Sequence, residues 1–221
     1  MISWIREAKR SVRALQRQTA SPARGKLDAD LANAAAAHHH VSEARRRYLS
    51  ANERLEIHRG VVRAAPSPTP GHNRWARRIA NRLDADERDD GAEGWVFVTA
   101  NDIDLCIEPE EVRQPDIAGF RRSRWRAEWE DTSPIPAPPN WACEIWSTGN
   151  SLTDREELLE AYFAASDVEA VWTIDRATAT LEVFERGAKR WKRTLLIDDP
   201  TTRFRAAPFE SIELTLHELL R

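Results

Sequence analysis

Two acidic residues, Asp116 and Glu144, lie within apolar runs and are the strongest candidates for chemistry in this sequence. Asp116 follows Pro115 at the head of the run 117–120, and Glu144 lies in the middle of the run 141–146. A carboxylate inside a buried strand is costly unless it is paired, hydrogen-bonded or bound to a metal. Two such carboxylates on adjacent strands could hold Mg²⁺, a hard cation that prefers oxygen ligands. The alternative is that each acid pairs with one of the chain's many arginines.

These two acids need a sheet to position them, and the rest of the pattern predicts a mixed α/β domain. Short runs of apolar residues between turn residues predict strands at 54–64 (a hairpin turning at Arg59–Gly60), 95–98, 103–107, 115–120, 141–146, 168–174, 180–186 and 191–197. A helical stretch separates 141–146 from 168–174, so a right-handed crossover would make these two strands parallel.

Three helices are predicted in this domain. Trp75, Ile79 and Leu83 share one face of a helix at 72–83, because they recur every four residues. The second helix lies at about 154–165, where Ser151 or Thr153 could form the N-cap with Glu156 or Glu157 near the first turn. A short helix closes the chain within 209–220.

The domain predicted to carry these elements spans residues 50–221, and residues 1–48 read as a helical appendage. Within the appendage we expect a basic amphipathic helix at 2–18, a linker at 20–28 and an alanine-rich helix at 29–48. His38, His39 and His40 are adjacent and therefore cannot share one helix face, which argues against a functional site there.

Composition limits the function classes open to the chain. The formal net charge of the 221 residues is −3, so no global basic field indicates nucleic acid. Local basic clusters at 45–47, 74–82 and 121–126 are typical of solvated faces, and contact with nucleic acid stays open. Trp125 and Trp129 lie in the charged loop that begins with the last of these clusters, and they are the best aromatic candidates for exposure.

The expected location is the cytoplasm. Cys106 and Cys143 are too few for a disulfide framework and lie in apolar runs, as buried thiols of a reducing compartment do. Residues 1–20 have no continuous apolar segment of the kind found in signal peptides, and no run reaches membrane-spanning length.

The order of these motifs resembles the PD-(D/E)xK nuclease superfamily, in the branch of small bacterial proteins called Uma-two, which is described as one of restriction endonucleases. The resemblance covers residues 50 to 220 and implies a restriction-endonuclease-like fold, in which helices flank a central mixed sheet. It is carried by the segments 53–60 (ERLEIHRG), 68–72 (PTPGH), 115–122 (PDIAGFRR), 141–147 (WACEIWS) and 205–214 (RAAPFESIEL).

The resemblance also implies roles for individual residues. It makes Asp116 and Glu144 the ligands of Mg²⁺ or Mn²⁺, and it adds Glu56 as a third catalytic acid. Three more positions match family residues: His72, Asp154 and Tyr162. In the superfamily the metal lowers the pKa of a water that attacks phosphorus, and a lysine helps to position or activate this water. The implied substrate is DNA.

The sequence departs from the family pattern at that lysine. Superfamily members carry it two residues after the second acid, where this chain has Trp146, and the Uma-two branch carries it at the position of Leu158. Arg155 is close in sequence, but arginine stays charged and is a poor proton acceptor. Two hypotheses therefore stand. The protein is a metal-dependent endonuclease that hydrolyses DNA, or a catalytically inactive module on the same fold that binds nucleic acid or a protein partner. A homodimer is compatible with both.

Overall fold

The computed structural model describes residues 55–65, 68–87, 94–105, 111–147 and 149–220, together with Glu43 and Arg47. Residues 44–221 form one compact unit. Most of the predicted appendage, including its three histidines, lies outside the described residues, as does Cys106. Of the predicted helix 29–48, Glu43 and Arg47 are described, and both are helical and exposed. Among the described helices, none is long and apolar enough to cross a membrane.

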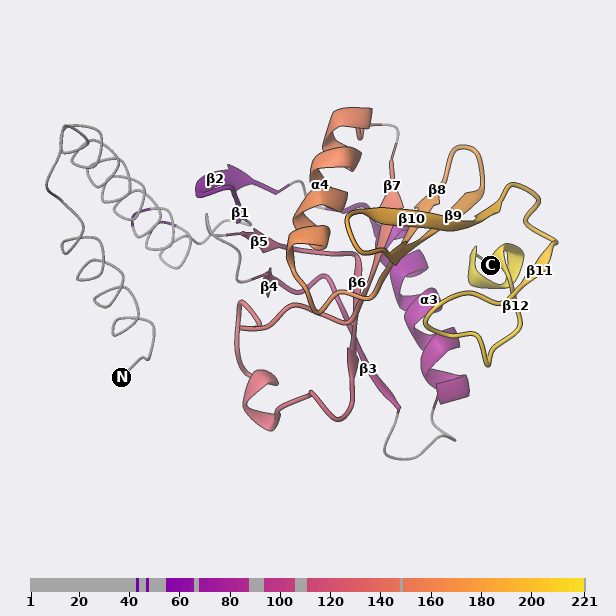
Figure 1. The fold of residues 1–221 in the computed structure, drawn as a ribbon, viewed down its shortest axis with the longest axis horizontal. Coiled ribbons are helices and arrows are strands. Elements are labelled where there is room, and N and C mark those ends of the chain that lie inside the picture. Colours follow the sequence, from indigo (N-terminus) through magenta and orange to yellow (C-terminus); the bar gives the residue numbers. More distant parts are fainter. Residues whose placement is uncertain are drawn as a thin grey trace, which may run out of the picture. The chain divides into compact units, whose positions relative to one another are not determined.

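A six-stranded sheet forms the centre of the domain (Figure 1). Its strands lie in the order β10 (Trp191–Ile197), β9 (Thr180–Arg186), β8 (Ala170–Asp175), β7 (Trp141–Trp146), β6 (Ile117–Arg121) and β3 (Trp95–Thr99). β7 and β8 are parallel, and α4 (Leu152–Ala164) connects them, as predicted. All other neighbours in this sheet are antiparallel. The structure thus confirms the mixed sheet and places the strand of Glu144 in its interior.

Helices cover both faces of this sheet. The odd-numbered residues of β7, from Trp141 to Ile145, belong to a core that includes α3 (Pro70–Glu87) and α5 (Leu216–Leu220). Ala142 belongs to a second core on the other face, with Tyr162 of α4. Because side chains alternate along a strand, Glu144 faces α4 like Ala142. The alternation therefore directs one carboxylate of a buried strand toward a helix rather than toward solvent.

A second, smaller sheet supplies the remaining part of the candidate site. Its order is β2 (Val61–Ala64), β1 (Leu55–His58), β5 (Val112–Arg113) and β4 (Ile103–Asp104). β1 and β2 form the predicted hairpin, and both turn residues have positive φ, 49° at Arg59 and 74° at Gly60. A two-residue turn of this kind matches the twist of the strands. β5 was not predicted from the sequence.

The C-terminal segment packs onto the α3 side of the large sheet. β11 (Arg203–Phe204) pairs with β12 (Leu214–Thr215), and α5 follows directly as the predicted final helix. Phe209 lies between them and packs against Trp141 and Trp172 at centroid distances of 5.1 and 5.6 Å. These aromatic contacts pack against the α3 face of β7, the strand that carries Glu144.

Both ends of α4 are capped by side chains. Ser151 is the N-cap, and its hydroxyl accepts from the backbone N–H of Asp154 while the Asp154 carboxylate accepts from the backbone N–H of Ser151. The predicted N-cap is confirmed, but its acidic partner is Asp154 and not Glu156 or Glu157, because only the third helical position can reach back to the N-cap. These hydrogen bonds to Ser151 lower the pKa of Asp154.

Arg186 of β9 caps the other end of α4. Its guanidinium donates to four backbone carbonyls, at 2.5–2.9 Å, which belong to Tyr162, Phe163, Ala165 and Val168. The last carbonyls of a helix have no partner within the helix, so one cation here satisfies several of them at once.

Replacing Arg186 with Met should therefore lower the free energy of unfolding by about 3 kcal/mol, since hydrogen bonds from a charged donor are worth roughly 1.5–3 kcal/mol each and water replaces some of them. Urea denaturation measures the change. The matched control is Arg193→Met on the neighbouring strand, where an exposed arginine has one carboxylate partner, Glu182, at 2.5 Å. That variant should lose less than about 1 kcal/mol. Equal losses in the two variants would contradict the capping role.

Candidate functional site

Asp116 and Glu144 lie opposite each other on neighbouring strands. Ile117 of β6 pairs with Cys143 of β7 in antiparallel register, so the next pair along the strands is Asp116 with Glu144. Opposite residues of an antiparallel pair have Cβ atoms roughly 5 Å apart and on one face of the sheet. The structure thus brings together the two predicted carboxylates.

The Asp116 carboxylate is held from two sides. Its Oδ2 accepts a hydrogen bond of 2.7 Å from the backbone N–H of Ile145, on the strand that carries Glu144. Its Oδ1 lies 2.6 Å from Nε2 of His72, in the first turn of α3. This second contact has the distance of an ion pair but not the angles of a hydrogen bond. His72 therefore belongs to the candidate site, and α3 is the element that brings it there.

Glu144 is almost completely buried, with 7% of its surface exposed. Its Oε1 accepts a 2.5 Å hydrogen bond from the hydroxyl of Tyr162 on α4. Burial and then the charge of Asp116 raise the pKa of Glu144 well above its ordinary value, whereas the bond from Tyr162 opposes this rise. Burial and the neighbouring Glu144 in turn raise the pKa of Tyr162. Tyr162 is thus both a core residue and the direct partner of the candidate ligand.

Glu56 of β1 is the third predicted acid, and it approaches the other two from the small sheet. Its negative charge also raises the pKa of Glu144, which places it within electrostatic range of the pair. Glu56 Oε1 accepts from the backbone N–H of Gln114 at 3.1 Å, and Oε2 lies 3.5 Å from Nη1 of Arg113. Three carboxylates with one arginine beside them form a region with an excess of negative charge.

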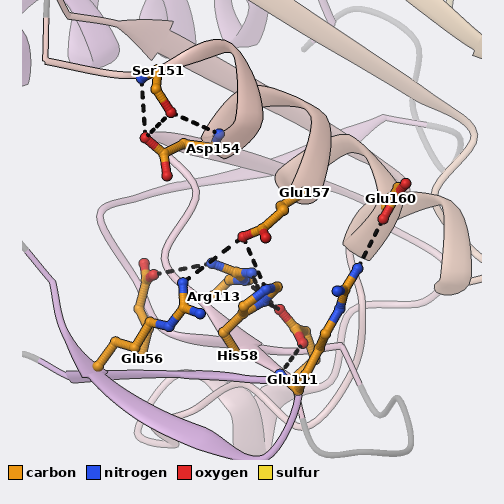
Figure 2. Close-up of polar contacts among 10 residues, drawn as sticks. Glu56, His58, Glu111, Arg113, Ser151, Asp154, Glu157 and Glu160 are labelled. Atoms are coloured by element: carbon orange, nitrogen blue, oxygen red, sulfur yellow. Dashed lines mark hydrogen bonds and ion pairs between the residues drawn. The ribbon is translucent and has the colours of Figure 1, made fainter.

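A buried polar network connects Glu56 to helix α4 (Figure 2). Arg113 Nε donates to Oε1 of Glu111 at 2.5 Å, and Nδ1 of His58 lies 2.8 Å from the same oxygen. The guanidinium of Arg113 also contacts His58 Nδ1. On the other side of the ring, His58 Nε2 lies 3.2 Å from Oε2 of Glu157. His58 and Glu111 are each 3% exposed, so the network joins the small sheet to α4 around two buried polar side chains.

Sequence reasoning missed this network. Arg113 and Glu111 lie within six residues before Asp116, in a stretch that was not assigned to any strand. Their proximity to Pro115–Asp116 was the one available signal. The arginine matters because it is the cation whose charge lowers the pKa of Glu144, although burial and Asp116 outweigh it.

The donor set fits a hard divalent cation. Glu144 Oε1 is bound by Tyr162, and the charge of Asp116 destabilises the ionised form of Glu144, which a bound cation would relieve. Oxygen ligands of this kind suit Mg²⁺ or Mn²⁺. No three His, Cys, Asp or Glu side chains of the described residues converge as a ready-made cage. Waters would have to complete the shell, as Mg²⁺ permits, since this ion usually keeps several of them.

The aromatic candidates of the loop after β6 are not exposed platforms. Trp125 and Trp129 are half-buried, and their rings pack on Phe120 at centroid distances of 5.3 and 5.9 Å. The indole N–H of Trp125 also donates to Glu130. These two candidates are therefore partly covered, because the loop folds back over the α4 face of β6.

A comparison with known families identifies the chain. The family model Uma2, described as "Putative restriction endonuclease", matches residues 41–217. The chain belongs to the Uma2 family. This confirms the family predicted from the order of the motifs. No curated protein matches the sequence.

The fold of this Uma2 protein also matches a solved structure. A crystal structure from Anabaena variabilis, described as that of "a putative nuclease belonging to DUF820", has a TM-score of 0.60 at 18% sequence identity. The match covers 78% of this chain and 94% of that chain. At this identity the likeness shows a shared fold, and it confirms the predicted nuclease-like fold class.

Three positions bear on the lysine that the family resemblance implies, and all three lie in the described part of the chain. Leu158 is half-buried and packs into the core beneath α4. Arg155 is bound to Asp175 at 2.9 Å and stacks on Trp146. Lys192 lies on β10, separated from β7 by two strands. The described residues thus bring Asp116 and Glu144 together, and none of these three side chains is a lysine beside them.

Proposed function

We propose that this Uma2 protein is a metal-dependent nuclease that hydrolyses phosphodiester bonds of DNA. The observation that carries the proposal is the pairing of Asp116 with Glu144 across β6 and β7, in a domain of a family described as restriction endonucleases. Restriction-endonuclease-like proteins generally use divalent metals. Two adjacent carboxylates supply the hard oxygen ligands that such metals require.

In this proposal Asp116 and Glu144 hold Mg²⁺ or Mn²⁺, and Glu56 assists as the third acid. The bound ion would lower the pKa of a water and neutralise charge on the phosphate. The chain's own residues then have positioning roles. The backbone N–H of Ile145 orients Asp116, and the Tyr162 hydroxyl orients Glu144. His72 Nε2 lies 2.6 Å from Oδ1 of Asp116 and holds that carboxylate from the α3 side.

The second candidate function is a catalytically inactive module that binds nucleic acid or a protein partner. Leu158 favours it, because an apolar residue stands where the family pattern places the lysine. Leu158 lies one helical turn, about 6 Å, before Tyr162 on the same face of α4. Since Tyr162 reaches Glu144, a lysine at position 158 would extend toward the same carboxylates.

Cleavage of supercoiled plasmid DNA with Mg²⁺ or Mn²⁺ tests the two functions, with and without Leu158→Lys. A nuclease should nick DNA in metal and not in EDTA, and Leu158→Lys should raise the rate by about tenfold or more, since a positioned acid–base group contributes on the order of 10²–10⁴-fold. The matched control is Leu159→Lys, another half-buried leucine of α4, which follows Leu158 and lies about 100° further round the helix. No cleavage by the wild type, nor by Leu158→Lys, would exclude the nuclease and leave the inactive module.

A further inference from the structure

Helix α3 carries a row of exposed arginines. Arg74, Arg77 and Arg78 are exposed, whereas Ile79 and Leu83 are fully buried in the core. The helix contains no acidic residue from position 70 to 83. Three arginines at a spacing of three and four residues lie side by side on a helix. The exposed surface of these three residues is therefore positively charged.

Acids do not neutralise this row within the described part of the chain. Arg74 and Arg77 have no ion pair there, and Arg78 donates only to the backbone carbonyl of Leu220, at 3.5 Å. The basic cluster after β6 differs: Arg121 pairs with Glu169 at 2.7 Å, and Arg124 pairs with Asp167 at 2.9 Å. The guanidinium groups of Arg74, Arg77 and Arg78 therefore stay available for an external anion.

The same helix begins at the candidate site. His72 in its first turn contacts Asp116, and Arg74 follows two residues later. Arg176, from the loop after β8, stacks on Trp75 of α3 at 4.5 Å and is exposed. Arg77, one turn after Arg74, lines a groove of about 370 Å³ between α3 and β3. Arg122 is the second cation that lines this groove, and Asp84 and Glu130 are its acids. The exposed arginines thus follow α3 from the turn after His72 onward.

We propose that Arg74, Arg77 and Arg78 form a phosphate-binding row that holds a nucleic-acid backbone along α3, the helix whose first turn contacts Asp116. The proposal rests on the nuclease function proposed above and assigns the surface that engages the substrate. Successive phosphates of one strand are about 3.4 Å apart along a duplex axis, and the helix rises about 6 Å from Arg74 to Arg78. The row therefore fits two or three consecutive phosphates. Guanidinium groups suit this task because their planar donors match phosphate oxygens.

The test measures binding without cleavage. A fluorescein-labelled 20-base-pair DNA duplex and an RNA duplex of the same sequence are titrated with protein in EDTA, by anisotropy, at several KCl concentrations from 50 to 200 mM. The variant is Arg74→Gln with Arg77→Gln and Arg78→Gln, which keeps helix propensity. The matched control is Lys189→Gln with Arg190→Gln and Lys192→Gln. These exposed cations lie at the β9–β10 turn, with β8 and β9 between them and β7.

The α3 variant should bind at least about tenfold more weakly, and the slope of log K against log[salt] should fall in magnitude by roughly 2–3, since each lost phosphate contact removes about 0.9. The control should keep the wild-type slope. Loss on one duplex only would identify whether DNA or RNA is the ligand of the row.

Three results would contradict the proposed phosphate-binding row. They are no binding by the wild type, an unchanged slope of log K against log[salt] in the α3 variant, or equal losses of affinity in the variant and the control. The nuclease proposal is judged separately. If the wild type does not cut DNA but its binding depends on these three arginines, the phosphate-binding row is supported and the nuclease function is rejected.

Discussion

Replacing Asp116 with Asn should reduce metal-dependent cleavage by more than about 100-fold, the loss expected when a group that stabilises transition-state charge is removed. Asparagine keeps an oxygen that can accept from the N–H of Ile145, so the β6–β7 junction should survive. What the substitution removes is the negative charge that faces Glu144 and that a divalent cation would neutralise. Initial rates of plasmid nicking at saturating Mn²⁺ measure the effect.

The matched control for Asp116 is Asp167→Asn. Asp167 is an exposed aspartate between α4 and β8 that pairs with Arg124. This variant has the same change of charge and should cut DNA at the wild-type rate. Equal activity in wild type and Asp116→Asn would mean that any cleavage comes from another site or another protein.

Replacing Glu144 with Gln should stabilise the metal-free protein at alkaline pH, on the order of 2 kcal/mol, because it removes a buried charge that lacks a dedicated cation. The folded state raises the pKa of Glu144, mainly through burial and Asp116. Its contribution to stability is therefore full below the ordinary carboxylate pKa and is lost as pH rises through the raised pKa. Glutamine does not titrate, and its amide oxygen can still accept from Tyr162.

Urea denaturation in EDTA at several pH values from 5 to 9 measures this prediction. The wild type should lose stability relative to Glu144→Gln as the pH rises. Addition of Mn²⁺ should restore stability to the wild type but not to the variant, because only the wild type retains the ligand. A variant that is less stable than the wild type at every pH would show that the ionised carboxylate stabilises the fold.

Much of the fold could be predicted from sequence because its central elements are strongly patterned. β7 lies in an apolar run that is interrupted only by Glu144. Because α4 connects β7 to β8, a right-handed crossover predicted that the two strands are parallel, and they are. The Pro115–Asp116 pair marked the start of β6, and the register then placed Asp116 opposite Glu144. The family's other matched histidine and tyrosine, His72 and Tyr162, also lie at this site.

The polar network around Arg113 could not be predicted because its parts have no local signal. β5 has only two residues, too few for a periodicity. Glu111 follows an acidic run that is typical of a solvated loop, yet it is 3% exposed. Its burial is tolerable because Arg113 and His58 reach it from two different strands. Such compensation depends on tertiary contacts, which residue spacing does not encode.

Calorimetric titration of Mn²⁺ into the wild type and into Asp116→Asn with Glu144→Gln tests the carboxylate site most directly. The account predicts that the wild type binds the ion, that its affinity rises with pH because Glu144 must lose a proton, and that the double variant does not bind. Absence of binding in the wild type, or equal binding in the double variant, would mean that these acids serve the fold alone.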